Sequence, residues 1–178
     1  MRTVVAVLLV VLTLAFAACA WLFYFDTLHL LVVEPGVLYR DGFDGMRHFE
    51  NAYRQRPFKT VIDLQAEDDP EFSREEAMSE RGFCKEHGIA WHSLPIRSKQ
   101  VPTPEQMRQL VALVGNEAGR PVLVHDGNGV VAVGMMVAVW QKEGMGYPYE
   151  RVLGSVRLFN HPEPTELYDF IKRLYNKQ

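Results

Sequence analysis

The chain has 178 residues, with 19 Lys and Arg against 22 Asp and Glu, and a net charge of −3. Arg2 is the only charged side chain among the first 25 residues, so residues 26–178 hold 18 basic and 22 acidic side chains, a net charge of −4. This balance excludes a basic nucleic-acid-binding protein that works by counterion release. The 153 residues after residue 25 suit one domain. Two cysteines, Cys19 and Cys84, cannot form a disulfide framework.

The N-terminal segment, residues 4–25, is predicted to anchor the chain in a membrane. Its 22 residues carry no charge, and a helix of that length spans roughly 33 Å, enough to cross the hydrocarbon core. Aromatic residues gather at 21–25, as at a membrane–water interface. Two alternatives are a cleaved signal peptide with Ala15 and Ala17 before the cut, and a lipoprotein signal ending at Cys19. The apolar run exceeds the ~7–15 residues of a signal core, which favours a retained anchor.

The charges beside this segment predict its orientation. The N-terminal side carries Arg2 and the amino group, whereas the other side opens with Asp26, His29 and Glu34. Basic residues stay preferentially on the cytoplasmic side. We therefore expect a single-pass protein of the cell membrane with its domain outside the cytoplasm.

The rest of the chain alternates between short β-branched runs and longer helical patterns, which predicts an α/β domain over residues 36–178 after a linker at residues 26–35. Strands are expected at residues 37–40, 60–64, 89–94 and 121–125. Helices are expected at residues 44–57, 73–88, 103–114, 130–140, 148–158 and 164–175. The segment 130–140 is apolar on every face, so its helix should be buried on all sides.

Three of the predicted helices begin with capping residues. Asp44 can cap the first of them, which Pro57 ends. Ser73 and Glu76 have the spacing of a capping box. Thr103 and Gln106 repeat that spacing with a proline at the first helical position.

The turn Asp126-Gly127-Asn128-Gly129 follows the apolar strand 121–125 and leads into the buried helix. A strand that stops at a glycine-containing turn and opens a helix is a ready-made oxyanion site, because backbone N–H groups and the helix dipole converge there. This turn is therefore the first candidate for chemistry.

The order and spacing of five segments resemble the cysteine-dependent protein tyrosine phosphatase superfamily, in its small dual-specificity branch. The segments are Gly36-Val37-Leu38-Tyr39-Arg40, Thr60-Val61-Ile62-Asp63-Leu64, Leu94-Pro95, Thr103-Pro104-Glu105-Gln106, and Arg120-Pro121-Val122-Leu123-Val124-His125. The resemblance implies a phosphatase-like fold, with a central, mostly parallel sheet flanked by helices. Together with the leader, it also implies a bacterial protein.

The family motif is His-Cys-x-x-Gly-x-x-Arg-Ser/Thr-Gly, in which the cysteine thiolate attacks phosphorus and the arginine holds the phosphate oxygens. His125, Gly129 and Gly134 match its histidine and two glycines. Asp126 stands where the cysteine belongs, and Ala132 where the arginine belongs, while Val133 takes the hydroxyl position. The family's general acid lies in the loop after the Leu-Pro strand end, but residues 95–104 contain no carboxylate. The resemblance therefore implies a pseudophosphatase.

We expect no catalytic residues in this degenerate loop, which is defined by His125, Asp126, Gly129 and Ala132. Asp126 adds a negative charge to a cradle built for a dianion, and two like charges ~4 Å apart repel by roughly 4 kcal/mol at an effective dielectric of 20. Phosphate binding should therefore be weak or absent. The protein would act by binding or scaffolding, and the predicted binding surface consists of Asp126, Gly127, Asn128, Gly129, Val130 and Val131.

Other interpretations of the same residues stay open. Asp126 and His125 can be the centre of an altered phosphate-ester hydrolase, although aspartyl phosphorylation usually needs a metal ion. Asp126 beside the apolar segment 130–132 can also recognise a neutral or amine group. The structural alternative is that Asp126 accepts backbone N–H bonds in place of an anion, and that His125 is a hydrogen-bonded histidine near the loop.

The remaining candidates are weaker. Arg97 and Lys99 lie in the loop that should overhang the turn, where they can attract an acidic partner or simply be solvated. Cys84 is expected to be a partly buried, inert thiol. No metal is expected, since the histidines lack the spacing of a metal site; they are His87, His92 and His161. No cofactor and no nucleic-acid partner are expected either.

Overall fold

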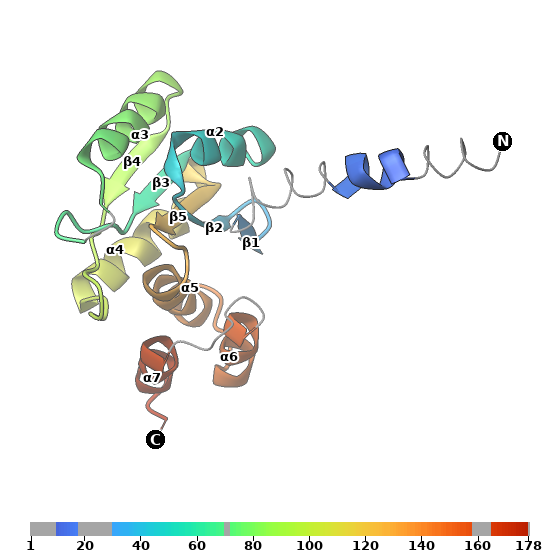
Figure 1. Cartoon of the computed structure of the whole chain (residues 1–178). Coiled ribbons are helices and arrows are strands. Elements are labelled where there is room, and N and C mark those ends of the chain that lie inside the picture. The colour runs from blue at the N-terminus through green and yellow to red at the C-terminus, as the bar shows by residue number, and fades with distance from the viewer. Residues whose placement is uncertain (1–9, 18–29, 70–71, 158–164, 178) are drawn as a thin grey trace.

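The computed structural model describes residues 10–17, 30–69, 72–157 and 165–177. Five strands form one mixed sheet in the order β1-β2-β5-β3-β4 (Figure 1). The strands are β1 (Leu31–Glu34), β2 (Leu38–Gly42), β3 (Thr60–Asp63), β4 (Ala90–Ser93) and β5 (Val122–Asp126). Only the β1–β2 pair is antiparallel within this sheet, and the other three pairs are parallel. The predicted α/β class and the mostly parallel sheet are confirmed.

Helices cover both faces of this sheet. They are α2 (Gly45–Gln55), α3 (Arg74–Glu86), α4 (Pro104–Gly115), α5 (Val131–Glu143), α6 (Tyr149–Arg157) and α7 (Thr165–Leu174), with a short 3₁₀ turn, η1 (Glu117–Gly119). Val61 and Leu123 pack into a cluster with residues of α2 and α3, whereas their neighbours Ile62 and Val124 pack with α4, α5 and α7. Alternate strand residues therefore feed two cores, as the period of a strand requires.

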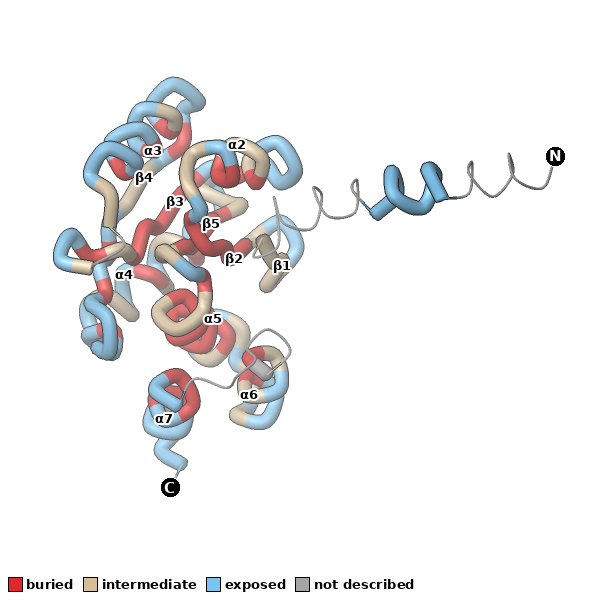
Figure 2. The backbone as a smooth tube through the Cα atoms, viewed as in Figure 1, coloured by how far each residue is buried: buried red, intermediate tan, exposed pale blue. Residues whose placement is uncertain are grey.

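Helix α5 is the centre of the larger core. Every residue from 133 to 141 is buried, and Figure 2 shows this helix and the central strands as the most deeply buried parts of the chain. It contacts α4, α6 and α7 as well as the sheet. The prediction of a helix buried on all sides is confirmed, and the loop that precedes α5 therefore rests on a rigid base.

The capping box predicted at Thr103 is confirmed, the one predicted at Ser73 is confirmed only in its serine half, and the cap predicted at Asp44 is wrong. The Thr103 hydroxyl accepts from Gln106 N at 3.2 Å and the Gln106 side chain accepts from Thr103 N at 2.8 Å, a complete capping box. The Ser73 hydroxyl accepts from Glu76 N at 3.3 Å. Asp44 makes no side-chain cap, because its dihedral angles (φ −111°, ψ 52°) differ from the extended ones that capping needs. The chain instead enters α2 through Gly45, which has a positive φ.

The segment predicted to be a linker, residues 26–35, includes part of the sheet, so this prediction is wrong for residues 31–34. Leu31–Glu34 forms β1, which pairs antiparallel with β2 and places Leu31 opposite Arg40. The sequence of this strand shows no clear alternation of apolar and polar residues, because it has only four residues and all of them are half buried at the sheet edge. The sheet therefore starts five residues before the expected domain start at residue 36.

The membrane prediction falls mostly on residues 4–9 and 18–25, outside the described residues. Residues 10–17 are helical, and their apolar side chains are exposed, from 58% for Val10 to 77% for Phe16. Among the residues that the structure describes, no helix is long and apolar enough to cross a membrane.

Candidate functional site

The predicted turn lies at the carboxyl end of β5, the central strand of the sheet, and leads directly into α5 (Figure 1). In open α/β sheets, ligands bind in the crevice outside the carboxyl ends of the strands. The position expected for chemistry is therefore also the position that the topology favours.

The turn packs tightly on the end of β2. Phe43 N donates to Asp126 O at 2.7 Å, and the buried Arg40 donates through Nη2 to Gly129 O. Gly129 has a φ of +70°, and a Cβ there would lie 2.7 Å from the carbonyl carbon and oxygen of Asp41. Only glycine fits this approach, so the turn packs directly against the backbone of β2.

The side chain of Asp126 bonds to the turn that it begins. Its Oδ1 accepts from Asn128 N at 3.0 Å and from Gly129 N. These inward-facing N–H groups are the ones that a bound oxyanion would use. The expectation that Asp126 accepts backbone N–H bonds is confirmed.

Burial controls the charges of this turn. It raises the pKa of Asp126, although the hydrogen bond from Gly129 and the charge of His125 pull in the opposite direction. Burial also lowers the pKa of Arg40 to about 10, an effect that the nearby Asp126 partly offsets. Arg40 and His125 thus influence the charge of Asp126 from the protein interior. The role of Arg40 was not predicted from the sequence.

His125 lies behind the turn and not at its surface. Both His125 and Glu80 are 1% exposed, and His125 Nε2 lies 3.0 Å from Glu80 Oε1. The same oxygen accepts from Trp91 Nε1 at 3.0 Å, and the rings of Phe43 and Phe49 contact the imidazole. His125 is thus a hydrogen-bonded buried histidine, as the structural interpretation expected. It does not line the cleft described below.

Burial lowers the pKa of His125, but the charge and hydrogen bond of Glu80 raise it more. With smaller contributions from Asp63 and Asp41, its pKa is about 9. The raised pKa favours a protonated His125 beside the Glu80 carboxylate in the protein interior. Nδ1 of His125 is buried and has no hydrogen-bond partner among the described residues. Sequence reasoning missed Glu80, although the helical spacing of Ala77, Glu80 and Cys84 places this acid on the buried face of α3.

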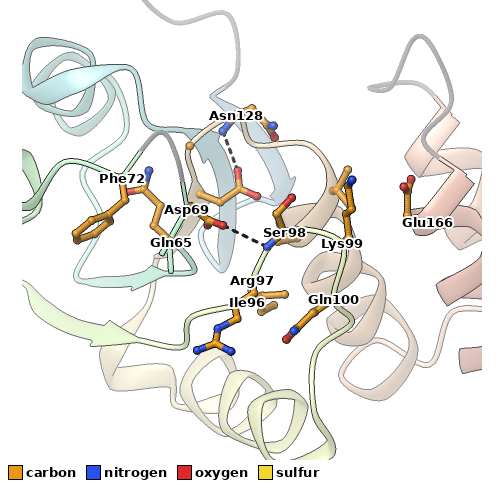
Figure 3. Close-up of a pocket in the computed structure, with 14 residues that line it drawn as sticks. Gln65, Asp69, Phe72, Ile96, Arg97, Ser98, Lys99, Gln100, Asn128 and Glu166 are labelled. Carbon is orange, nitrogen blue, oxygen red and sulfur yellow. Dashed lines mark hydrogen bonds between the residues drawn. The ribbon is translucent and has the colours of Figure 1, made fainter. Parts of the chain in front are cut away.

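A cleft of about 410 Å³ opens beside the turn (Figure 3). Its walls come from the turn and start of α5, from the segments before α3 and after β4, and from α7. The residues are Gln65, Asp69, Phe72, Ile96, Arg97, Ser98, Lys99, Gln100, Asp126, Gly127, Asn128, Val131, Ala132 and Glu166. Four residues of the predicted binding surface are among them, whereas Gly129 is buried and Val130 does not line the cleft.

The loop after β4 overhangs the turn as predicted, and it brings Arg97 and Lys99 to the cleft. Arg97 Nε pairs with Asp68 Oδ2 at 3.0 Å. The carboxylates Asp69 and Glu166 also line the cleft, although neither belongs to residues 95–104. Asp69 is held by bonds from Ala66 N at 3.2 Å and Ser98 N at 3.3 Å. The sequence could not show these two carboxylates because they come from distant segments.

The possible metal ligands are scattered over the fold. Within the part of the chain that the structure describes, no three His, Cys, Asp or Glu side chains are grouped to hold a metal ion. His161 lies outside that part.

Cys84 is buried against the aromatic core under α2 and α3, with 1% of its surface exposed. Burial, together with the charge of Glu80, raises the pKa of its thiol to about 12. We expect iodoacetamide to leave Cys84 unmodified in the native protein at pH 8 and to modify it in 6 M guanidinium chloride. Peptide mass spectrometry distinguishes Cys84 from Cys19. If iodoacetamide alkylated Cys84 in the native protein as fast as it alkylates the thiol of free glutathione, the burial of Cys84 would be contradicted.

A family model described as DSP-PTPase phosphatase fused to NAD+ kinase matches residues 51–161, more than half of the chain. A comparison with curated proteins found no match.

Several solved structures share the fold. The core catalytic domain of the PP-IP phosphatase SIW14 from S. cerevisiae, in complex with citrate, superposes with a TM-score of 0.66 at 19% identity, over 80% of this chain and 83% of that one. The active form of Tk-PTP gives 0.64 at 19% identity, over 84% and 97%. P. aeruginosa TpbA gives 0.62 at 19% identity, over 81% and 83%. At these identities the similarity establishes the fold alone.

Proposed function

Because the chain belongs to the DSP-PTPase family of phosphatases, we propose that it is a membrane-anchored member that has lost phosphate-ester hydrolysis and acts by binding a partner. The proposal has two parts, the inactivity of the turn after β5 and the membrane location. They rest on different residues and are tested separately.

The observation that carries the first part is the bonding of Asp126. This residue takes the place of the family's cysteine, and its carboxylate accepts the N–H groups of Asn128 and Gly129. An incoming phosphate would have to displace that carboxylate and then lie beside its negative charge. A buried carboxylate is also a poorer nucleophile toward phosphorus than a thiolate when no metal offsets the charge.

Ala132 supports the same proposal. It lines the cleft at the family's arginine position, and its methyl group makes no hydrogen bond. Arginine contributes bidentate, charge-assisted bonds to a phosphate, and a methyl group cannot replace them. Arg40 does not compensate for the loss, because its guanidinium is buried under the turn and donates to Gly129 O.

We expect the full chain in detergent to hydrolyse p-nitrophenyl phosphate no faster than a buffer blank between pH 5 and 8. The reason is that nucleophile, phosphate clamp and a positioned acid are all absent from their family positions. A double variant, Asp126→Cys with Ala132→Arg, serves as the matched positive control. Turnover by the unmodified protein that Asp126→Ala abolishes would overturn the proposal in favour of a hydrolase centred on Asp126 and His125.

The membrane part is supported by the apolar segment 4–25 and by the exposure of the side chains of residues 10–17. We expect the chain to remain in the membrane pellet after extraction at pH 11, and a variant that starts at residue 27 to be released. Intact mass separates the alternatives, because cleavage shortens the chain and lipidation at Cys19 adds acyl mass. Protease added outside intact cells should digest the domain if it faces away from the cytoplasm.

A further inference from the structure

The cleft beside the turn has an uneven charge distribution. Carboxylates come from three different segments: Asp126 from the end of β5, Asp69 from the loop after β3, and Glu166 from α7. Figure 3 shows Asp69 and Glu166 among the residues around the cleft. The lining also holds the cations Arg97 and Lys99. Arg97 is already paired with Asp68 at 3.0 Å. Within the described residues, Lys99 has no carboxylate within ion-pair distance.

The two basic side chains behind the turn, Arg40 and His125, already have partners. Arg40 is buried beneath the turn, where it lies beside Asp126 and donates to Gly129 O. His125 is paired with Glu80. Neither of them lines the cleft. An anion entering the cleft would therefore meet the carboxylates of Asp69, Asp126 and Glu166. They are opposed by Lys99 and by Arg97, whose charge is shared with Asp68.

Part of the lining of the cleft is apolar, and its side chains are those of Phe72, Ile96, Val131 and Ala132. Such a lining suits an aliphatic stem, and the carboxylates suit a positively charged head at its end. Lysine and arginine side chains have this composition, because they bury their methylene groups along apolar surface while the charged group finds a polar partner.

We propose that this cleft binds a lysine or arginine side chain presented by a partner protein. The inference rests on the proposed binding function and names the chemistry of the partner. The site would thus have reversed the charge preference that its family resemblance implies. The carboxylate of Asp126 attracts the cationic head group. The hydrogen bond from Asn128 N to its Oδ1 holds this carboxylate in position. Glu166 adds a further negative charge to the lining.

The test uses isotope-labelled full chain in detergent micelles and four capped tripeptides, acetyl-Gly-X-Gly-amide, where X is lysine, arginine, glutamate or phosphotyrosine. Chemical shifts of the backbone amides of residues 96–100 and 126–132 are followed during titration. The lysine and arginine peptides should bind with millimolar or better affinity, and the glutamate and phosphotyrosine peptides at least tenfold more weakly.

Four variants show whether the binding uses the cleft. Asp126→Asn keeps an oxygen for the N–H groups of the turn and should weaken the basic peptides about tenfold, while Glu166→Gln should weaken them about threefold. Asp169→Asn, on the same helix α7 but outside the cleft, should have no effect. Lys99→Gly removes the opposing cation at a residue whose φ of +63° suits glycine, and it should strengthen the binding of the basic peptides.

Each outcome separates this inference from the proposed function. Equal or tighter binding of the glutamate or phosphotyrosine peptide overturns the inference, and so does the absence of binding by all four peptides. In both cases the proposed inactivity still depends only on the p-nitrophenyl phosphate assay. Release of phosphate from the phosphotyrosine peptide would instead overturn the proposed function itself.

Discussion

Replacing Glu80 with alanine is expected to lower the free energy of unfolding by about 3–5 kcal/mol, the usual cost of removing one member of a buried ion pair. The substitution leaves the fully buried cation of His125 without its carboxylate and also removes the acceptor of Trp91 Nε1. Urea unfolding at pH 7, followed by tryptophan fluorescence, measures the change. This cost is a large share of the roughly 5–15 kcal/mol that stabilises a typical domain.

Glu80→Gln keeps this test informative if the alanine variant does not fold. Glutamine retains an oxygen for Trp91 and His125 but has no charge, so the destabilisation should persist in part. A loss below about 1 kcal/mol for both variants would show that His125 and Glu80 do not form a buried charged pair.

The same pair predicts how stability depends on pH. The pKa of His125 in the folded protein is about 9, above the ~6.5 of an unfolded histidine. A raised pKa means that the folded state holds the proton more tightly, so this contribution is complete below about pH 6.5 and is lost as pH rises through 9. Unfolding free energies from pH 6 to 9.5 should fall more steeply for the wild type than for Glu80→Gln. Parallel curves would contradict the prediction.

Gly129→Ala is expected to destabilise the protein by about 2–5 kcal/mol. A non-glycine residue at a positive φ costs about 1–2 kcal/mol, and a Cβ at 2.7 Å from the backbone of Asp41 adds an overpacking cost of about 1–3 kcal/mol. Thermal unfolding at constant pH provides the measurement. The added Cβ would meet backbone atoms of Asp41, which belong to strand β2. The strain therefore cannot be relieved by rotation of a flexible side chain.

Gly146→Ala is the matched control for that variant. Gly146 also has a positive φ, +65°, but nothing lies within 4 Å of its would-be Cβ. It should therefore show only the conformational part of the cost, about 1–2 kcal/mol. If the two variants lose the same stability, the close approach of the turn to β2 does not contribute.

The helices and central strands could be predicted because their residues carry local patterns. The apolar run 121–125 indicates a buried strand, the all-apolar run 130–140 indicates a buried helix, and Thr103 with Gln106 indicates a helix start. Strand β1 could not be predicted, since four half-buried residues at a sheet edge leave no clear alternation. Asp44 matched the residue preference of a cap but not its backbone geometry.

The site could be predicted only where it is continuous in sequence. The turn at residues 126–129 and the overhanging loop follow from their places after predicted strands. The partners of the turn come from elsewhere in the chain: Arg40 from β2, Glu80 from α3 and Glu166 from α7. A single sequence does not show which distant residues contact each other in the fold. For Glu80, the helical spacing indicates only that its side chain is buried.

Under the proposed membrane anchoring, strand β1 would also limit how far the domain can lie from the bilayer. With the proposed anchor ending at residue 25, five residues remain before Leu31, and fully stretched they reach roughly 18 Å. The short tether would keep the cleft in a thin layer beside the bilayer. Confinement of this kind raises the effective concentration of the cleft for any partner that is held in the same layer. Even a basic side chain with weak affinity would then bind the cleft when its protein is anchored in the same membrane.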